Sequence, residues 1–237
     1  MSVPATEPRS LSDAAYQRLR SDIVSCRLVP GARLTERALA ESTGFGLSPI
    51  RDALTRLDHE GLVHSLPRKG YQIAPLTLKS IDDLFTLWRI VGPEIARLGL
   101  RDATPEEHRQ LIGTFQKMAE LSRDTTRGEG DTPLRLVELA DVAFGTLAAA
   151  TSNNYLITIH RRLQNDMARI WVLTAQSDAP IPDLGVDHRW VEMIERRDGE
   201  AAAETVRASL GEVHASALRI FSRWPSVAAS EITPLHA

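Results

Sequence analysis

Two arginines on either side of a glycine turn are the residues whose type and spacing best fit a chemical role. Arg37 and Arg51 lie within residues 34–54, where two short runs of helical periodicity meet at Gly44. The guanidinium group donates paired hydrogen bonds to phosphate oxygens and to the edge of guanine. Arginines on two helices joined by a tight turn therefore predict a helix-turn-helix whose second helix enters the DNA major groove.

Capping residues predict where these two helices begin and end. Thr35 is the expected N-cap of the first helix, and Gly44 suits the left-handed position that ends it. Ser48 is the expected N-cap of the second helix, with Pro49 in its first position, where the missing N–H costs nothing. Helical spacing predicts a core face of Ile50, Ala53, Leu54 and Leu57, and an outer face of Arg51, Asp52, Thr55 and Arg56.

Another helix is expected before this pair. Ser10 or Ser12 can cap it, and its periodicity runs to about residue 25. The apolar stripe predicted to face the core consists of Leu11, Ala15, Leu19 and Ile23.

A β-hairpin is expected after the pair. Residues 62–64 and 71–74 read as two short strands, and residues 67–70 form a basic tip between them. Three helices followed by a hairpin make a winged helix-turn-helix, which we expect to occupy residues 10–75, with Pro75 at the boundary.

The remainder of the chain is predicted to be an antiparallel helical bundle, so the fold class is mainly α. The domain is expected to span residues 76–226, and no strand signal is visible from residue 77 to 224. About six amphipathic helices with short links can enclose a ligand or pair with a second copy. Residues 1–9 are expected to be disordered and residues 227–237 to form a tail. The helices are expected at about 77–101, 104–124, 132–151, 153–175, 185–198 and 200–223.

Composition narrows the classes of protein to consider. The 237-residue chain has a formal net charge of −3, but residues 1–75 carry 10 Lys and Arg against 8 Asp and Glu, which fits a DNA-contacting head on an acidic body. Cys26 is the only cysteine, which excludes an intramolecular disulfide. No signal peptide or membrane span is visible, so a cytoplasmic protein is expected. No GxSxG, Walker A or HExxH string indicates an enzyme.

Short motifs in both parts of the chain resemble the GntR family of bacterial transcription regulators, in the FadR-type subgroup with an all-helical FCD effector domain. The second part contributes DVAF at 141–144 and AATSNNYL at 149–156. The first part contributes PGARL at 30–34, RALA at 37–40, SPIRDAL at 48–54 and RKG at 68–70.

The resemblance implies a homodimer that binds double-stranded DNA at a short palindromic operator. Arg37 and Arg51 stand where the family has DNA-contacting arginines, and Lys69 stands at a wing tip that family members lay in the minor groove. Leu47 departs from the arginine that many members carry, so it fits contact with a thymine methyl group and an altered half-site. The DNA-binding candidates are Arg33, Arg37, Leu47, Ser48, Pro49, Arg51, Thr55, Arg68, Lys69 and Gly70.

The resemblance also implies a pocket in the bundle, where many members bind a divalent metal through one Asp and three His. Asp141 matches the Asp, but the three His positions are Gly145, Asp187 and Ser209, with His188 beside the second. No cofactor is therefore expected. If a Zn²⁺-like ion were bound, Asp141 and His188 would be its candidate ligands.

Trp88 and Gly92 replace an Arg and a Glu that the family carries on the first helix of the effector domain. Without the arginine there is no bidentate clamp for a carboxylate, so the expected ligand is larger and more apolar or aromatic. The alternative is that Trp88 fills the space itself. His160 lies in an apolar stripe and reads as a core residue rather than a ligand. The pocket candidates are Trp88, Asp141, Gly145, His160, Asp187, His188 and Ser209.

Two functions remain open at this point. The first is a DNA-binding regulator, in the form of a repressor, that a small-molecule effector in the bundle controls. The second is a constitutive DNA-binding dimer whose pocket is degenerate.

Overall fold

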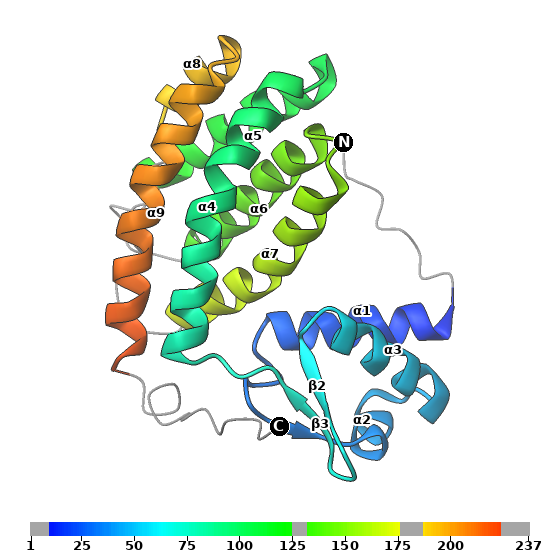
Figure 1. The fold of residues 1–237 in the computed structure, drawn as a ribbon. Coiled ribbons are helices and arrows are strands. Elements are labelled where there is room, and N and C mark those ends of the chain that lie inside the picture. The colour runs from blue at the N-terminus through cyan, green and yellow to red at the C-terminus, as the bar shows by residue number, and fades with distance from the viewer. Residues whose placement is uncertain (1–9, 125–131, 176–186, 224–237) are drawn as a thin grey trace. The chain divides into compact units, whose positions relative to one another are not determined.

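The computed structural model describes residues 10–124, 132–175 and 187–223, and the chain divides into two compact units between Leu76 and Thr77 (Figure 1). The predictions for residues 1–9 and 227–237 lie outside the described residues. The N-terminal unit contains α1 (Leu11–Val24), β1 (Arg33–Leu34), α2 (Glu36–Thr43), α3 (Leu47–His59), β2 (Val63–Leu66) and β3 (Gly70–Ile73). The second unit contains α4 (Leu78–Asp102), α5 (Pro105–Asp124), α6 (Thr132–Ala150), α7 (Asn154–Ala175), α8 (Arg189–Glu195) and α9 (Gly199–Phe221).

The N-terminal unit is a winged helix-turn-helix, and the mainly α fold class is confirmed. The three helices enclose an apolar core that includes Leu19 of α1 with Ile50 and Leu54 of α3. The wing is a three-stranded antiparallel sheet in the order β1-β3-β2. The sequence did not predict β1, because two residues carry no periodicity of their own and are ordered only by pairing with β3. Leu11, predicted to face the core, is exposed, since it occupies the first position of α1.

The caps of α2 are confirmed. The Thr35 side chain accepts a hydrogen bond from the backbone N–H of Ala38, and Gly44 adopts a left-handed φ of 79°. For α1, Ser10 is the cap rather than Ser12, because its side chain accepts from the backbone N–H of Asp13. Both helices therefore begin where a side-chain oxygen satisfies an otherwise unpartnered donor.

The predicted start of α3 is wrong. The helix begins at Leu47 after the N-cap Gly46, which makes no side-chain cap bond, so Ser48 and Pro49 are its second and third residues. The first four N–H groups of any helix lack an intrahelical partner, so a proline in the third position still removes no helical hydrogen bond. Proline therefore marks the first turn of a helix but does not mark its first residue.

The second unit is a helical bundle organised around α4. This helix lies between α9 on one side and α6 on the other, α6 also contacts α5 and α7, and α8 packs on α5 (Figure 1). A capping box between Thr77 and Ser80 begins α4. The helix expected over 185–198 is shorter, because Arg197 takes a left-handed φ of 53° and the Asp198 side chain caps α9.

Helix α4 approaches its neighbours at a glycine. A Cβ added to Gly99 would overlap the backbone carbonyl of Leu147 on α6. By contrast, a Cβ added to Gly113 of α5 would meet no atom within 4 Å. The close contact of α4 with α6 therefore requires a residue without a side chain at position 99.

We expect Gly99→Ala to destabilise the bundle and Gly113→Ala to stabilise it slightly. Overpacking of this kind costs about 1–3 kcal/mol, whereas Ala in an open helix position gains about 0.5–1 kcal/mol over Gly. Thermal unfolding followed by circular dichroism measures both, with a shift of roughly 2–4 °C for each kcal/mol in a domain of this size. An unchanged midpoint for Gly99→Ala would show that the two helices separate without cost.

Candidate nucleic-acid interface and effector pocket

Helix α3 has one buried face and, opposite it, one exposed face. Its inner residues Ile50, Ala53, Leu54 and Leu57 are all 0% exposed, so the helix is fixed in the core of its unit. Four of the predicted DNA-binding side chains on α3 are exposed, and Leu47, at 52%, is the apolar one among them. Pro49 is half-buried at the first turn. The exposed candidates on this face are Leu47, Ser48, Arg51 and Thr55.

Arg51 forms a bidentate ion pair with Glu36 of α2. Its Nε donates to Glu36 Oε1 at 3.0 Å, and its Nη2 donates to Oε2 at 2.7 Å. The hydrogen bond from the guanidinium group lowers the pKa of the Glu36 carboxyl below its usual range and raises that of Arg51 above its own, so both stay charged. The pair joins the two helices of the helix-turn-helix, and Glu36 was absent from the sequence-based candidates.

The other arginine predicted to contact DNA, Arg37 on α2, is held more loosely. Arg37 pairs with Glu41 at 2.8 Å within the same helix, and the side chains are 87% and 66% exposed. Such exposed pairs one turn apart contribute about 0.3–0.5 kcal/mol. Arg37 is therefore free to exchange its partner for a phosphate.

Arg56 is exposed but engaged by side chains of its own unit. It donates to Asp13 at 2.7 Å, and its guanidinium carbon lies 3.8 Å from the centre of the Tyr16 ring. The Tyr16 hydroxyl donates to Glu60 at 2.6 Å, and burial, followed by this hydrogen bond, raises the pKa of Tyr16 to about 12. These contacts tie α1 to α3 and occupy the Arg56 guanidinium group with partners of its own unit.

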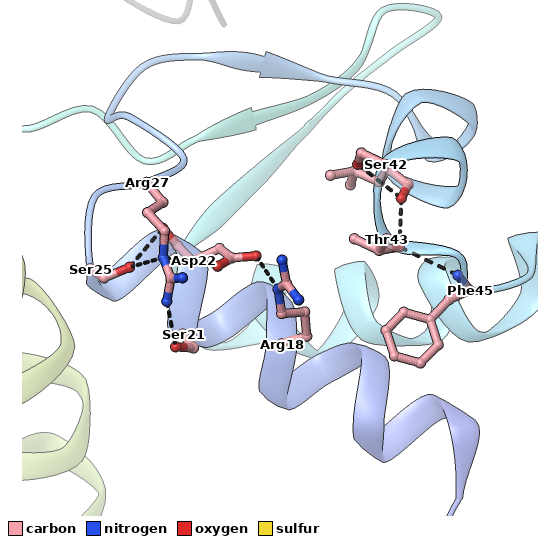
Figure 2. A network of polar contacts seen from close by, with 9 residues as sticks. Arg18, Ser21, Asp22, Ser25, Arg27, Ser42, Thr43 and Phe45 are labelled. Atoms are coloured by element: carbon pink, nitrogen blue, oxygen red, sulfur yellow. Dashed lines mark hydrogen bonds and ion pairs between the residues drawn. The ribbon is translucent and has the colours of Figure 1, made fainter.

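A second polar network closes the end of α1. Asp22 accepts from Arg18 at 2.7 Å and lies 3.2 Å from Arg27, whose Nε also donates to Ser25 (Figure 2). In the same view the backbone N–H of Phe45 donates to the Thr43 hydroxyl, at 3.5 Å, near the turn of the helix-turn-helix. Much of the positive charge of the unit is thus neutralised by its own carboxylates.

The wing carries cations that are not neutralised in this way. Arg33, Arg68 and Lys69 are exposed, and within the described part of the chain no ion pair involves them. Arg33 reaches the wing because β1 pairs with β3, opposite Gln72. Gly70 has a φ of 84°, and a Cβ there would overlap the carbonyl of Leu34, so only glycine fits this turn.

Three aromatic rings meet inside the helical unit. Trp88 of α4 lies 5.4 Å from Phe144 of α6 and 5.5 Å from His160 of α7, between ring centres. Trp88 is 8% exposed and His160 is 5% exposed. Burial, with a smaller contribution from Arg161, lowers the pKa of His160 to about 4, so its ring is neutral at neutral pH. The structure brings the predicted pocket residues Trp88 and His160 together, and Phe144 joins them in the same cluster.

The other pocket candidates do not gather around these rings as a donor set. Asp141 is exposed on α6, and Gly145 is half-buried with open space where a Cβ would lie. The Ser209 hydroxyl donates to the carbonyl of Thr205. Across the described ranges no three His, Cys, Asp or Glu side chains are placed to hold a metal ion, so the residues do not fit the metal of the family.

Asp187 and His188 lie at the start of α8. Asp187 accepts from the backbone and the guanidinium group of Arg189, at 2.8 and 2.7 Å. His188 is exposed and lines an open hollow of about 370 Å³ between α5 and α8, together with Gln116, Ala119, Glu120, Val191 and Glu192.

Comparison with known proteins covers both units. Residues 11–73 match the family model "Bacterial regulatory proteins, gntR family", and residues 83–212 match the FCD domain. The HTH-type transcriptional regulator BphR of Paraburkholderia xenovorans is 27% identical over 86% of this chain and 84% of its own length. The HTH-type transcriptional repressor GlaR of Escherichia coli is 25% identical over 82% of this chain and 90% of its own.

The fold is also similar to that of solved structures. The structure described as E. coli McbR/YncC has a TM-score of 0.64 and 18% identity, and the match covers 89% of this chain and 96% of that one. A regulator from Rhodococcus has a TM-score of 0.60 and 16% identity over 88% and 97% of the two chains. Among the helices within the described ranges, none is long and apolar enough to cross a membrane.

The neutral, buried ring of His160 predicts a loss of stability in acid. An unfolded His takes up a proton below about pH 6.5, whereas folded His160 does so only near its pKa of about 4. The free energy of unfolding therefore falls as the pH drops from about 6.5 to 4, by on the order of 3 kcal/mol from this residue. His160→Gln removes that slope, and thermal unfolding across this pH range measures it.

His188→Gln is the control, because the His188 imidazole lies in solvent. It should keep the wild-type slope. Parallel curves for the wild type and His160→Gln would contradict the prediction, whatever the absolute stability of the variant.

Proposed function

The chain belongs to the GntR family of bacterial regulatory proteins and carries an FCD domain, and we propose that this DNA-binding transcription regulator is a homodimeric cytoplasmic repressor controlled by a small molecule in its helical unit. The observation that carries the proposal is the exposed outer face of α3, held rigidly by its 0%-exposed inner face. The relatives GlaR and RspR of Escherichia coli are named as repressors, which supports repression here.

The arrangement of side chains supports base contacts by α3 and phosphate contacts by the wing. Arg51 and Leu47 lie on the helix that enters the major groove, where base edges are distinguishable. Arg33, Arg68 and Lys69 surround the wing and suit phosphate contacts, which position a protein and make its binding salt-dependent. A leucine at the first position of the helix offers apolar contact to a thymine methyl group and no hydrogen bond.

A palindromic operator requires two copies of this unit, and α4 offers a surface for pairing. Leu87 and Ile90 are 40% and 66% exposed and lie about one turn apart on α4. Large apolar side chains grouped on an outer helix face are typical of protein interfaces. We assign this face to contact with a second copy of the chain.

The aromatic cluster of Trp88, Phe144 and His160 is the proposed effector site. Flat rings and a neutral imidazole suit an apolar or aromatic ligand that stacks on them. Such a ligand would change operator affinity by a coupling of about 1–3 kcal/mol. No metal or other cofactor is part of the proposal.

A constitutive regulator is the second candidate, because the same three rings already fill one another's space. Trp88 is buried against Phe144 and His160, so no ligand is needed to cover it. Thermal-shift screening of aromatic metabolites separates the two candidates. A compound that raises the unfolding midpoint and changes operator affinity supports the effector; a screen without one supports constitutive binding.

We expect full-length protein to select one palindromic sequence from random DNA duplexes, and Leu47→Arg to alter that sequence. A new arginine gains a bidentate contact with guanine, worth about 1–3 kcal/mol of discrimination. Lys69→Ala should instead weaken selected and random duplexes alike and reduce the slope of log affinity against log salt by about 1. Fluorescence anisotropy with the selected and a scrambled duplex measures each. Wild-type protein that prefers neither duplex would refute sequence-specific binding.

We expect Ile90→Glu to convert a dimer into a monomer and to weaken operator binding. A charge on this face would have to be buried in the interface, which is costly without a partner. Size-exclusion chromatography with light scattering measures the mass. Val142→Glu is the control, because Val142 is exposed on α6 rather than α4 and its replacement should leave the mass unchanged. An Ile90→Glu variant that stays dimeric would place the interface elsewhere.

A further inference from the structure

The ion pair between Glu36 and Arg51 differs from the pair that Arg37 forms with Glu41. It joins α2 to α3 across 15 positions of sequence, and it uses both carboxylate oxygens of Glu36. The pair of Arg37 with Glu41 lies within one helix and is made through one nitrogen. Glu36 is also only 25% exposed, so it is the less mobile member of its pair.

The pair uses one edge of the guanidinium group and leaves another open. Nε and Nη2 face Glu36, at 3.0 and 2.7 Å from its oxygens. An arginine has five N–H donors in a rigid plane. The hydrogens of Nη1 and the outer hydrogen of Nη2 therefore form a second donor edge, and within the described part of the chain Nη1 has no hydrogen bond. The side chain is 62% exposed, so this edge is open to a ligand.

That open edge matches one kind of DNA group best. Two parallel donors fit the O6 and N7 acceptors of guanine in the major groove. The carboxylate of Glu36 cancels the charge of Arg51 at close range, which weakens its attraction to phosphate but leaves its directed N–H donors intact. An arginine fixed in this way is suited to reading a base rather than to clamping the backbone.

We infer that Glu36 is a positioning residue that holds Arg51 side-on, so that the end-on edge of the guanidinium group reads a guanine in the operator. The inference rests on the proposed sequence-specific function. It assigns to Glu36, a residue that touches no DNA itself, the task of setting specificity. Glu36 favours sequence discrimination at the expense of general affinity for DNA, because releasing Arg51 would free one more cation for phosphates.

The test is Glu36→Gln in the full-length protein, with anisotropy measured on the selected palindrome and on a scrambled duplex over a range of salt. We expect affinity for the palindrome to fall, affinity for the scrambled duplex to stay or rise, and the ratio to drop about tenfold. The salt slope should steepen by up to about 1, since Arg51 becomes an additional phosphate contact. Glu41→Gln, with the same charge change on the same helix, should keep the ratio.

A modified base identifies the contact. Replacing each guanine of the palindrome by 7-deazaguanine removes the N7 acceptor. At one position the replacement should weaken the wild type about tenfold and leave Arg51→Ala and Glu36→Gln almost unaffected, which is the signature of coupled partners.

The outcomes separate the two proposals. A wild type with no preference for any sequence refutes the proposed function. A specific wild type whose ratio survives Glu36→Gln refutes the positioning role alone, as does a loss that is equal on both duplexes, since that is the result expected when Glu36 only stabilises the fold.

Discussion

Burial of the inner face of α3 is the constraint on which the DNA-binding unit depends. Ile50, Leu54 and Leu57 are 0% exposed in a core shared with α1, α2 and the wing, so the helix cannot rotate without exposing them. Each such side chain contributes about 1.5–3 kcal/mol when it is buried. Everything displayed on the outer face, from Leu47 to Thr55, inherits its direction from this contact. The ion pair with Glu36 then refines the position of one side chain on a helix that is already fixed.

Ion pairs organise the surface of the N-terminal unit, whereas aromatic rings meet in the interior of the helical unit. In the N-terminal unit, carboxylates such as Asp22, Asp13 and Glu41 engage arginines and limit the positive charge left for phosphates. In the helical unit, the interior position that the family resemblance assigns to an arginine is occupied by Trp88 among other rings. The outer face of α3 thus keeps Arg51 but carries Leu47 in place of an arginine, and in the helical unit Trp88 stands in place of another.

Local chemistry made much of this fold predictable, and contacts distant in sequence made the rest unpredictable. Thr35 and Gly44 were predicted as caps because each acts through its nearest neighbours along the chain. Pro49 misled by two positions, since any place in the first turn satisfies it. Three features depend on segments that meet only after folding: strand β1, the ion pair of Arg51 with Glu36, and the contact of Phe144 with Trp88. The predicted pocket residues are not all brought together, since Trp88 and His160 meet whereas Asp141 is exposed. Their role in binding a ligand stays a prediction.

Leu47 has a consequence for how such a protein diverges. Its side chain is more than half exposed, and the residues that fix α3 lie on the opposite face. Under the proposed function, replacement of Leu47 therefore alters base preference with little effect on the core. A duplicated gene can acquire a new set of target promoters through one codon while the ancestral copy keeps the old set. In this fold, the preference for a DNA target can evolve separately from the stability of the domain.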